Sequence, residues 1–233
     1  SISNEPEIPR PGSKITNGPP AFLCFVVLIK NLVNNLTPLY NYVSLRKGVN
    51  MKHEFRMYVG PMFGGKTTRM LSQVERYSYQ GLDTLLFKPR MDERYDSNSV
   101  VTHTGMKNDA IRVRTGTEIN EFVEAYSIGR PTTIAVDEAF MISGCGKALV
   151  NLFKSGHTIL VSSLQLSSDG SPYQEVQEMF PYATYVAVCP AVDPISKMDA
   201  YYTEKYGGRK DHAIEVGGAE MYRPRDWNGF FGG

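Results

Sequence analysis

The chain has 233 residues, and its 25 lysine and arginine residues almost balance 24 aspartate and glutamate residues, leaving a net charge of +1. This balance argues against bulk attraction to nucleic acid, although local basic patches remain compatible with it. With 42% hydrophobic residues, the chain can bury a substantial core. The three cysteines, Cys24, Cys145 and Cys189, have no paired spacing, which argues against a disulfide framework and indicates reduced thiols in a cytoplasmic protein.

Residues 1–50 differ from the rest of the chain and are expected to be a disordered or non-native extension. The first part is rich in proline, glycine, serine and asparagine, which is typical of disorder. Residues 21–33 are apolar, but they are too few to span a membrane and include Lys30, and no cleavage site of a secretory signal follows. Two interpretations stay open. The segment packs one amphipathic helix on the core, or Met51 is the true start, since Lys47-Gly48-Val49 can be encoded by codons that contain a ribosome-binding sequence.

From residue 51 onward, strand and helix signals alternate. Apolar runs predict strands at 55–59, 84–88, 133–136, 158–162 and 182–188, and helical periodicity predicts helices at 66–80, 118–126 and 147–154. Strands separated by helices need crossover connections, so we expect an α/β fold with a parallel sheet flanked by helices and ligands at the C-terminal strand ends. We assign residues 51–188 to this domain and residues 189–233 to a small C-terminal lobe. Residues 90–114 lack periodicity and are either a surface loop or an arm used in subunit contacts or ATP-linked ordering.

The turn between the first strand and the first helix satisfies the P-loop pattern G-x-x-x-x-G-K-[ST]. Glycines let the main chain wrap closely around a phosphate, and the helix N-terminus adds a positive partial charge. Lys66 then supplies an ammonium for the β- and γ-phosphates of ATP, and Thr67 places its hydroxyl on Mg²⁺. The predicted ATP-binding residues are Gly60, Pro61, Met62, Phe63, Gly64, Gly65, Lys66, Thr67 and Thr68. A glycine-rich turn that binds nothing is the alternative, but the helical spacing of the apolar residues after the loop favours a phosphate site.

An acidic pair follows the predicted strand at 133–136. Asp137 is the candidate for the Walker B acid that holds Mg²⁺, and Glu138 can accept a proton from an attacking hydroxyl. Such a pair alone is a weak signal, because acidic residues also cap helices or lie solvated at strand ends. Together with the P-loop, the pair predicts a site for ATP and Mg²⁺ in which Asp137 binds the cofactor and Glu138 is the general base.

Six segments, in order between residues 52 and 227, resemble the type II thymidine kinases of cells, bacteria and phages. The P-loop departs from the G-P-M-F-S-G-K-[ST]-[ST] of that family only at Gly64. The other segments are Lys88-Pro89 with Asp92-Glu93-Arg94-Tyr95, Thr102-His103, Asp137-Glu138-Ala139, Ala200-Tyr201-Tyr202-Thr203, and Val216-Gly217-Gly218-Ala219-Glu220 with Tyr222. The last segment is similar to the lasso loop with which the family closes over the base.

The resemblance implies a P-loop (RecA-like) fold whose small C-terminal lobe carries the lasso, and transfer of the ATP γ-phosphoryl group to the 5′-hydroxyl of thymidine. Glu138 would be the catalytic base, with Lys66 and Arg94 neutralising phosphate charge. The residues that it places at the substrate are Phe140 or Met141, Leu164, Thr203, Val216, Gly217, Gly218 and Tyr222. It also implies a homotetramer and feedback inhibition by dTTP, with neither a membrane nor a nucleic acid as partner.

The chain departs from the family at its structural zinc, which two C-x-x-C pairs hold around the C-terminal segments. Cys189 stands about where the first pair starts, but no second cysteine follows, so we predict no zinc. His212 with Cys189 and an acid is the only remaining candidate for a degenerate site. Packing of aromatic residues would then hold the lobe, with candidates at Tyr201, Tyr202, Tyr206 and Trp227. Residues 164–173 also lose an acid and one aromatic of the family pattern, which makes an altered nucleoside preference plausible.

Two rival functions fit part of the pattern. A RecA-type or helicase ATPase also uses a Walker lysine and an acidic pair, but Gly217-Gly218 with Tyr222 resembles a lid over a small planar base more than part of a motor. A catalytically inactive relative kept for binding is the second rival. Retention of Lys66, Thr67 and the acidic pair together argues against it.

Overall fold

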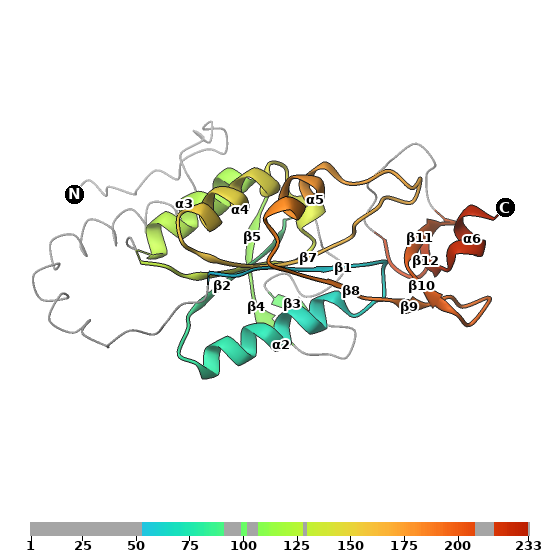
Figure 1. Ribbon diagram of the computed structural model, residues 1–233, viewed down its shortest axis with the longest axis horizontal. Coiled ribbons are helices and arrows are strands. Elements are labelled where there is room, and N and C mark those ends of the chain that lie inside the picture. Colours follow the sequence, from blue (N-terminus) through green and yellow to red (C-terminus); the bar gives the residue numbers. More distant parts are fainter. Residues whose placement is uncertain (1–52, 91–98, 102–106, 128–129, 208–216, 233) are drawn as a thin grey trace, which may run out of the picture. The chain divides into compact units, whose positions relative to one another are not determined.

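The computed structural model describes residues 53–90, 99–101, 107–127, 130–207 and 217–232 (Figure 1). The predicted extension at 1–50 and Met51 lie outside these residues. Both interpretations of the extension therefore stay predictions. Among the residues that are described, no helix is long and apolar enough to cross a membrane.

The core of the fold is a six-stranded sheet in which all neighbouring strands are parallel. Its strands are β1 (Phe55–Val59), β2 (Thr84–Pro89), β5 (Ile111–Val113), β6 (Thr133–Val136), β7 (Thr158–Ser163) and β8 (Tyr185–Val188). They lie in the order β5-β2-β6-β7-β1-β8. The central strands are continuous apolar runs because both faces of a parallel sheet are covered. The structure therefore confirms the predicted parallel sheet.

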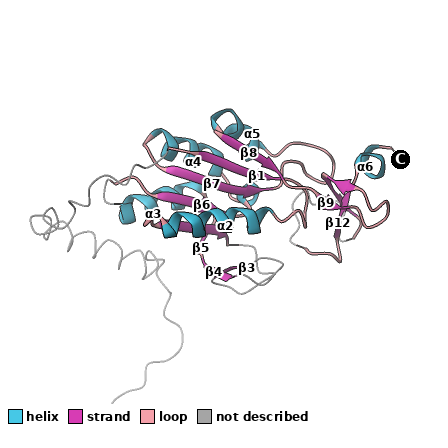
Figure 2. Cartoon of the chain, turned by 60° about the horizontal axis from the view of Figure 1, so that its bottom comes forward, coloured by secondary structure: helices cyan, strands magenta, loops and turns pink. Residues whose placement is uncertain are grey.

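Helices cover the two faces of this sheet (Figures 1 and 2). Helix α2 (Lys66–Tyr79) lies on one face, and α3 (Gly116–Ser127), α4 (Cys145–Lys154) and α5 (Gln174–Met179) lie on the other. Side chains alternate along each strand. Phe55 and Met57 of β1 pack into the core beneath α3 and α4, whereas Tyr58 packs against Met70 and Leu71 of α2. This layering fixes β1 in the interior and brings its C-terminal end to the loop that precedes α2.

Three features of the fold were not expected from the sequence. Residues 90–114 contain the edge strand β5 and a hairpin of β3 (Ser99–Val101) and β4 (Lys107–Asp109). Helix α5 has six residues, too few for a helical period to stand out. The expected strand at 182–188 is shorter, because a 3₁₀ turn over Phe180–Tyr182, with a proline in its first positions, delays β8 until Tyr185.

The C-terminal residues form two small antiparallel pairs and a short helix. Strands β9 (Ala191–Val192) and β10 (Asp199–Ala200) pair with each other, as do β11 (Tyr202–Lys205) and β12 (Tyr222–Arg225). Helix α6 (Trp227–Phe231) follows β12 directly. The boundary of this lobe at residues 188 and 189 stays a prediction.

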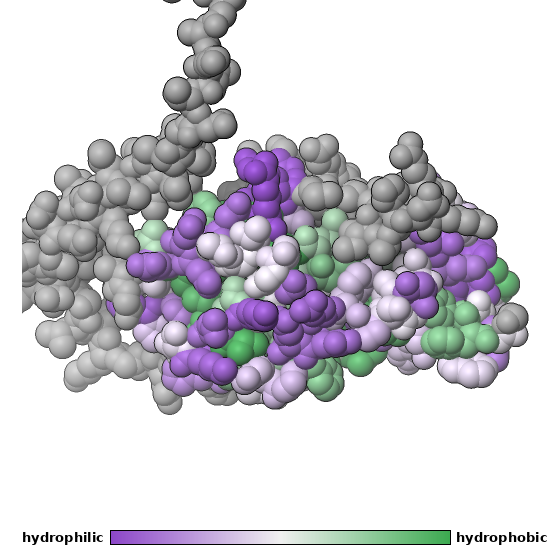
Figure 3. Space-filling model, turned by 90° about the horizontal axis from the view of Figure 1, so that it is seen from above, coloured by the Kyte–Doolittle hydropathy of each residue, from purple (hydrophilic) through white to green (hydrophobic). Residues whose placement is uncertain are grey.

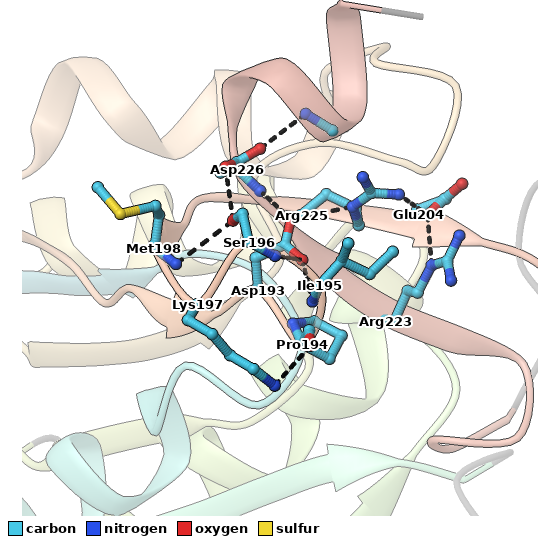
Figure 4. Close-up of polar contacts among 11 residues, drawn as sticks. Asp193, Pro194, Ile195, Ser196, Lys197, Met198, Glu204, Arg223, Arg225 and Asp226 are labelled. Atoms are coloured by element: carbon cyan, nitrogen blue, oxygen red, sulfur yellow. Dashed lines mark hydrogen bonds and ion pairs between the residues drawn. The ribbon is translucent and has the colours of Figure 1, made fainter.

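A buried carboxylate ties the lobe together (Figure 4). Asp193 is fully buried and accepts hydrogen bonds from Ile195 N at 2.7 Å, Arg225 Nε at 3.0 Å and Asp226 N at 3.0 Å. Burial alone would raise the pKa of this carboxyl, but the hydrogen bonds outweigh it and lower the pKa to about 2. Asp193 is therefore ionised and compensated at neutral pH, and it joins the turn after β9 to the junction of β12 and α6.

Further polar bonds extend this joint. Glu204 accepts from Arg223 Nε at 2.6 Å and from Arg225 Nη1 at 2.8 Å. Asp226 accepts from Ser196 Oγ at 2.7 Å and caps α6 through Gly229 N, also at 2.7 Å. We call the set Asp193, Ser196, Glu204, Arg223, Arg225 and Asp226 the polar knot. Of the four aromatic residues expected to hold the lobe, Tyr201, Tyr206 and Trp227 are 38%, 50% and 60% exposed, whereas Tyr202 is half-buried and stacks on Phe230 with ring centroids 5.1 Å apart.

Asp193→Asn should lower the free energy of unfolding by about 3 kcal/mol, because the amide removes the charge opposite Arg225 and turns a donor toward N–H groups. Since the pKa of Asp193 is lowered, its contribution is complete above the ordinary carboxyl pKa of about 3.9. It is lost as the pH falls toward about 2. Denaturant unfolding at pH 7 and at acid pH measures both effects. Asp199→Asn, at an exposed site on β10, is the matched control, and an equal loss in the control would contradict the prediction.

Candidate active site

The P-loop joins the C-terminal end of β1 to α2, as the sequence predicts. Phe63 and Gly65 have φ angles of 66° and 71°, on either side of Gly64. Left-handed residues in alternation with right-handed ones are typical of backbone nests that bind anions. The left-handed conformation is rare for a phenylalanine, and such strain is concentrated at functional sites. Lys66 begins α2 and is buried, with its ammonium donating to the carbonyl of Pro61 at 2.6 Å.

The main chain of Cys189 lies directly against this loop. Its N–H donates to the carbonyl of Val59 at 2.7 Å. A Cβ atom added to Gly60 or to Gly64 would approach the Cys189 carbonyl oxygen more closely than the 3.0 Å that real Cβ atoms respect. Close packing of the main chain therefore explains Gly64, the single position at which the loop departs from the family pattern.

Gly64→Ser, which restores the residue usual in the family, should destabilise this chain. The new Cβ must displace the Cys189 carbonyl, and overpacking of this kind costs about 1–3 kcal/mol. The same displacement should weaken ATP binding, because the loop itself has to move. Thermal unfolding with and without ATP measures both effects, and a melting temperature equal to that of the natural chain would contradict the prediction.

Thr67 and Asp137 meet beside the P-loop. The hydroxyl of Thr67 donates to Asp137 Oδ1 at 2.9 Å and lies 3.5 Å from Ser162 Oγ of β7. Asp137 is buried at the end of β6, and its N–H donates to the carbonyl of Phe87 at 2.9 Å. Burial, followed by the charge of Glu138, raises the pKa of Asp137 to about 6. A carboxylate and a hydroxyl this close are hard oxygen donors of the kind Mg²⁺ prefers, and a bound cation would favour the ionised form of Asp137.

Glu138 lies between the phosphate loop and a group of aromatic residues. It is half-buried and left-handed, with φ 50° and ψ 44°, and it precedes the 3₁₀ turn η1 (Ala139–Met141). The carboxylate is close enough to Asp137 and to Tyr173 to raise the pKa of both. A strained carboxylate between two predicted substrate sites is well placed for proton transfer.

The aromatic group is the pair of rings of Phe140 and Tyr173, and Tyr222 lies near Tyr173. The rings of Phe140 and Tyr173 have centroids 4.6 Å apart, and Phe140 N donates to Ser163 Oγ at the end of β7. Burial, then the proximity of Tyr222 and Glu138, raises the pKa of Tyr173. Of the two alternatives at 140 and 141, Phe140 is the residue whose ring packs on Tyr173, with an angle of 41° between the ring planes. Leu164, 8% exposed, directly follows β7 at the same edge of the sheet.

Tyr173 lies near the candidate site but is not among the residues that the sequence predicts there. In the sequence it only ends the run 164–173, which has lost an acid and an aromatic of the family pattern. Its position after Pro172 is a signal that could have indicated this place. A hairpin that leaves the C-terminal end of a strand brings its last residue back to that edge of the sheet.

Thr203 has a partner that the sequence did not suggest. It is 3% exposed on β11, and its hydroxyl accepts a hydrogen bond from Met62 N of the P-loop at 3.0 Å. The C-terminal lobe is thus bonded directly to the phosphate-binding loop. Thr203 is predicted to contact the base, and the structure adds a hydrogen bond to the P-loop.

The predicted lasso is described from Gly217 onward. Gly218 N donates to Glu220 Oε1 at 2.6 Å, and Met221 N and Tyr222 N donate to the carbonyl of Gly218 at 3.1 and 3.0 Å. Tyr222 is 9% exposed at the start of β12. Arg94, His103, His212 and Val216 lie outside the described residues, so their predicted contributions stay predictions.

The loop, the buried lysine and the acidic pair at the ends of β1 and β6 are typical of the class of P-loop α/β proteins, and aromatic residues lie near the acidic pair. A model of the family described as "Thymidine kinase" matches residues 53–226. The chain is 31% identical over 176 residues to a thymidine kinase of Pyrobaculum aerophilum, covering 72% of this chain and 92% of that protein. It is also 31% identical over 173 residues to a thymidine kinase of Thermococcus kodakarensis, covering 71% and 88%. The chain belongs to the thymidine kinase family.

Proposed function

We propose that this protein transfers the γ-phosphoryl group of ATP to the 5′-hydroxyl of thymidine. The observation that carries the proposal is the position of Glu138. It follows Asp137, which is bonded to Thr67 of the P-loop, and it lies near Tyr173 of the aromatic group. With ATP held on one side and a nucleoside on the other, the γ-phosphate and the 5′-hydroxyl would meet at this carboxylate. Family membership and the names of the two relatives support thymidine as the acceptor.

The chain's own residues supply most of the mechanism. The P-loop from Gly60 to Thr68 wraps the phosphates, and Lys66 exchanges its bond to the Pro61 carbonyl for the β- and γ-phosphates. Thr67 and Asp137 would hold Mg²⁺, which neutralises charge on the triphosphate when bound. Glu138 accepts the proton of the 5′-hydroxyl while that oxygen bonds to the γ-phosphorus. The bond from the γ-phosphorus to the bridging oxygen breaks, and ADP leaves. Arg94 is proposed to neutralise the transferring group.

The thymine is proposed to lie against the ring of Phe140. Tyr173 backs that ring at 4.6 Å, which supports a rigid face for the base. Main-chain groups of the lasso would hold the edge of the base, and Tyr222 would close the site. The remaining proposed contacts are Met141, Leu164, Thr203, Val216, Gly217 and Gly218.

We propose that the C-terminal lobe requires no zinc. The polar knot supports this, because its ion pairs and capping bonds already join the turn after β9 to the start of α6. Cys189 cannot assemble a tetrahedral site alone, and its thiol is buried. Prolonged treatment with EDTA should leave the melting temperature unchanged in the absence of nucleotide. A fall after chelation that added zinc reverses would contradict the proposal.

Family membership further supports a homotetramer that dTTP inhibits, in the cytoplasm, with no nucleic acid or membrane as partner. A lobe without zinc is the feature most able to change the number of subunits. Sedimentation with and without dTTP measures that number.

The proposed activity is tested by incubating the chain with ATP, Mg²⁺ and labelled thymidine, with deoxycytidine and deoxyuridine as competitors. We expect labelled thymidine monophosphate, with deoxyuridine competing better than deoxycytidine because its base differs from thymine only by a methyl group. Failure to phosphorylate any of the three nucleosides would overturn the proposal.

A further inference from the structure

A tight hairpin, residues 164–173, connects the end of β7 to α5. Leu166 and Pro172 form a β-bridge across it, and Ser167 N donates to the carbonyl of Ser171 at 2.9 Å. At its tip, Asp169 accepts from Ser171 N at 2.9 Å and from the Ser167 hydroxyl. These bonds make the hairpin a single compact unit, so a force on its tip is transmitted to its two ends.

Both ends of the hairpin reach the proposed base site. Leu164 is buried directly after β7, and the ring of Tyr173 packs at a tilt against Phe140. Tyr173 also lies close to Glu138 and Tyr222. A small shift of the hairpin would therefore move the wall of the base site without touching the P-loop.

The tip of the hairpin faces the C-terminal helix. A Cβ atom added to Gly170 would lie 3.6 Å from Phe230 Cε1 and 3.9 Å from Phe231 Cε1, so the two rings lie beside the turn with room for only about one methyl group between them. Tyr202 of β11 stacks on Phe230 with ring centroids 5.1 Å apart and meets Phe231 edge-on at 4.9 Å. We call Tyr202, Phe230 and Phe231 the aromatic clamp. Figure 3 shows hydrophobic and hydrophilic residues interspersed on one face of the molecule.

The clamp is fixed on its other side as well. Asp226 of the polar knot caps α6, and Tyr202 precedes Thr203, which is bonded to the P-loop. Helix α6 is therefore linked to three features: the polar knot, the strand that bonds to the P-loop through Thr203, and the hairpin. The family match ends at residue 226, one residue before α6 begins.

We infer that α6 is a positioning element of the nucleoside site, in which Phe230 and Phe231 hold the 164–173 hairpin so that Leu164 and Tyr173 stay against the base. The inference rests on the proposed function, because it assigns the base to this site. Phe230 and Phe231 touch neither the reacting atoms nor the nucleotide in this assignment. They act on the nucleoside through the hairpin.

The test compares Phe230→Ala and Phe231→Ala with the natural chain in steady-state kinetics. The KM for thymidine should rise by roughly tenfold, since a small misplacement of a positioning group costs one to two orders of magnitude. The KM for ATP and kcat should stay within about twofold of the natural values, and Phe230→Tyr, which keeps the ring, should restore the KM for thymidine. Val192→Ala is the control, because Val192 is 60% exposed on β9 of the same lobe and is not part of the clamp.

The outcomes separate this inference from the proposed function. A natural chain that phosphorylates no nucleoside overturns the function. An active natural chain whose alanine variants keep the KM for thymidine, or raise both KM values equally, overturns the inference. If the variants do not fold, the single tryptophan, Trp227 on α6, reports on the unmodified chain. Its emission should change saturably with thymidine, and no change would overturn the inference.

Discussion

Glu138→Gln should reduce kcat for thymidine phosphorylation by roughly a thousandfold. The amide has nearly the shape of the carboxylate but cannot accept the proton of the 5′-hydroxyl. Because Glu138 lies between the P-loop side and the aromatic group, the variant should still bind both substrates. The KM values for ATP and thymidine are therefore expected to stay within about threefold. Rates of thymidine monophosphate formation at saturating substrates measure the effect.

Glu121→Gln is the matched control for this variant. Glu121 is an exposed carboxylate on α3, so its neutralisation should leave kcat unchanged. A Glu138→Gln enzyme that keeps more than about a tenth of the natural kcat would be incompatible with a general base at this position.

Lys66→Met should lower kcat by roughly a hundredfold to a thousandfold and raise the KM for ATP, because it removes a preorganised cation from the phosphates. The methionine retains an apolar stem of similar length. Lys66 is 6% exposed, so the variant avoids the cost of burying a charge but loses the hydrogen bond to the Pro61 carbonyl, and the melting temperature should change little. Kinetics at varied ATP, with thermal unfolding of the same sample, separate the two effects.

Lys147→Met, at an exposed position on α4, is the matched control for charge removal. If Lys66→Met kept both the natural kcat and the natural KM for ATP, Lys66 could not be the phosphate-binding lysine of this loop.

The sequence was sufficient for features that are local or periodic. Strands β1 and β6 begin and end where their apolar runs predict, because buried parallel strands carry apolar residues on both faces. The P-loop and the acidic pair were equally readable, since each is defined by adjacent residues. Strand β5 could not be predicted, because its three residues are too few to show a period. They form a strand only through their pairing with β2 at the edge of the sheet.

The part of the candidate site that the sequence does not predict depends on long-range contacts. Gly64 is constrained by the carbonyl of Cys189, far along the chain, and no local pattern indicates that approach. The bond from Met62 to Thr203 spans 141 residues, and the pair of Asp193 and Arg225 spans 32. For this reason the sequence does not predict the contacts of the polar knot, although it contains all of the residues that make them.

These contacts give the C-terminal lobe a clear place in the mechanism. Thr203 bonds to the P-loop, Tyr222 approaches the aromatic group, and the clamp on α6 holds the hairpin that carries Tyr173. The lobe thus contacts the P-loop and lies near the proposed site of the base. A lobe loosened by Asp193→Asn should consequently lose nucleoside affinity together with stability.

The most direct test of the central claim follows the label of γ-labelled ATP in a reaction with the natural chain, Mg²⁺ and thymidine. We expect the label in thymidine monophosphate to equal the ADP formed, with both products almost absent without the nucleoside or in Glu138→Gln. ADP formation at the same rate without thymidine, with the label in inorganic phosphate, would contradict the account and identify the site as that of an ATPase.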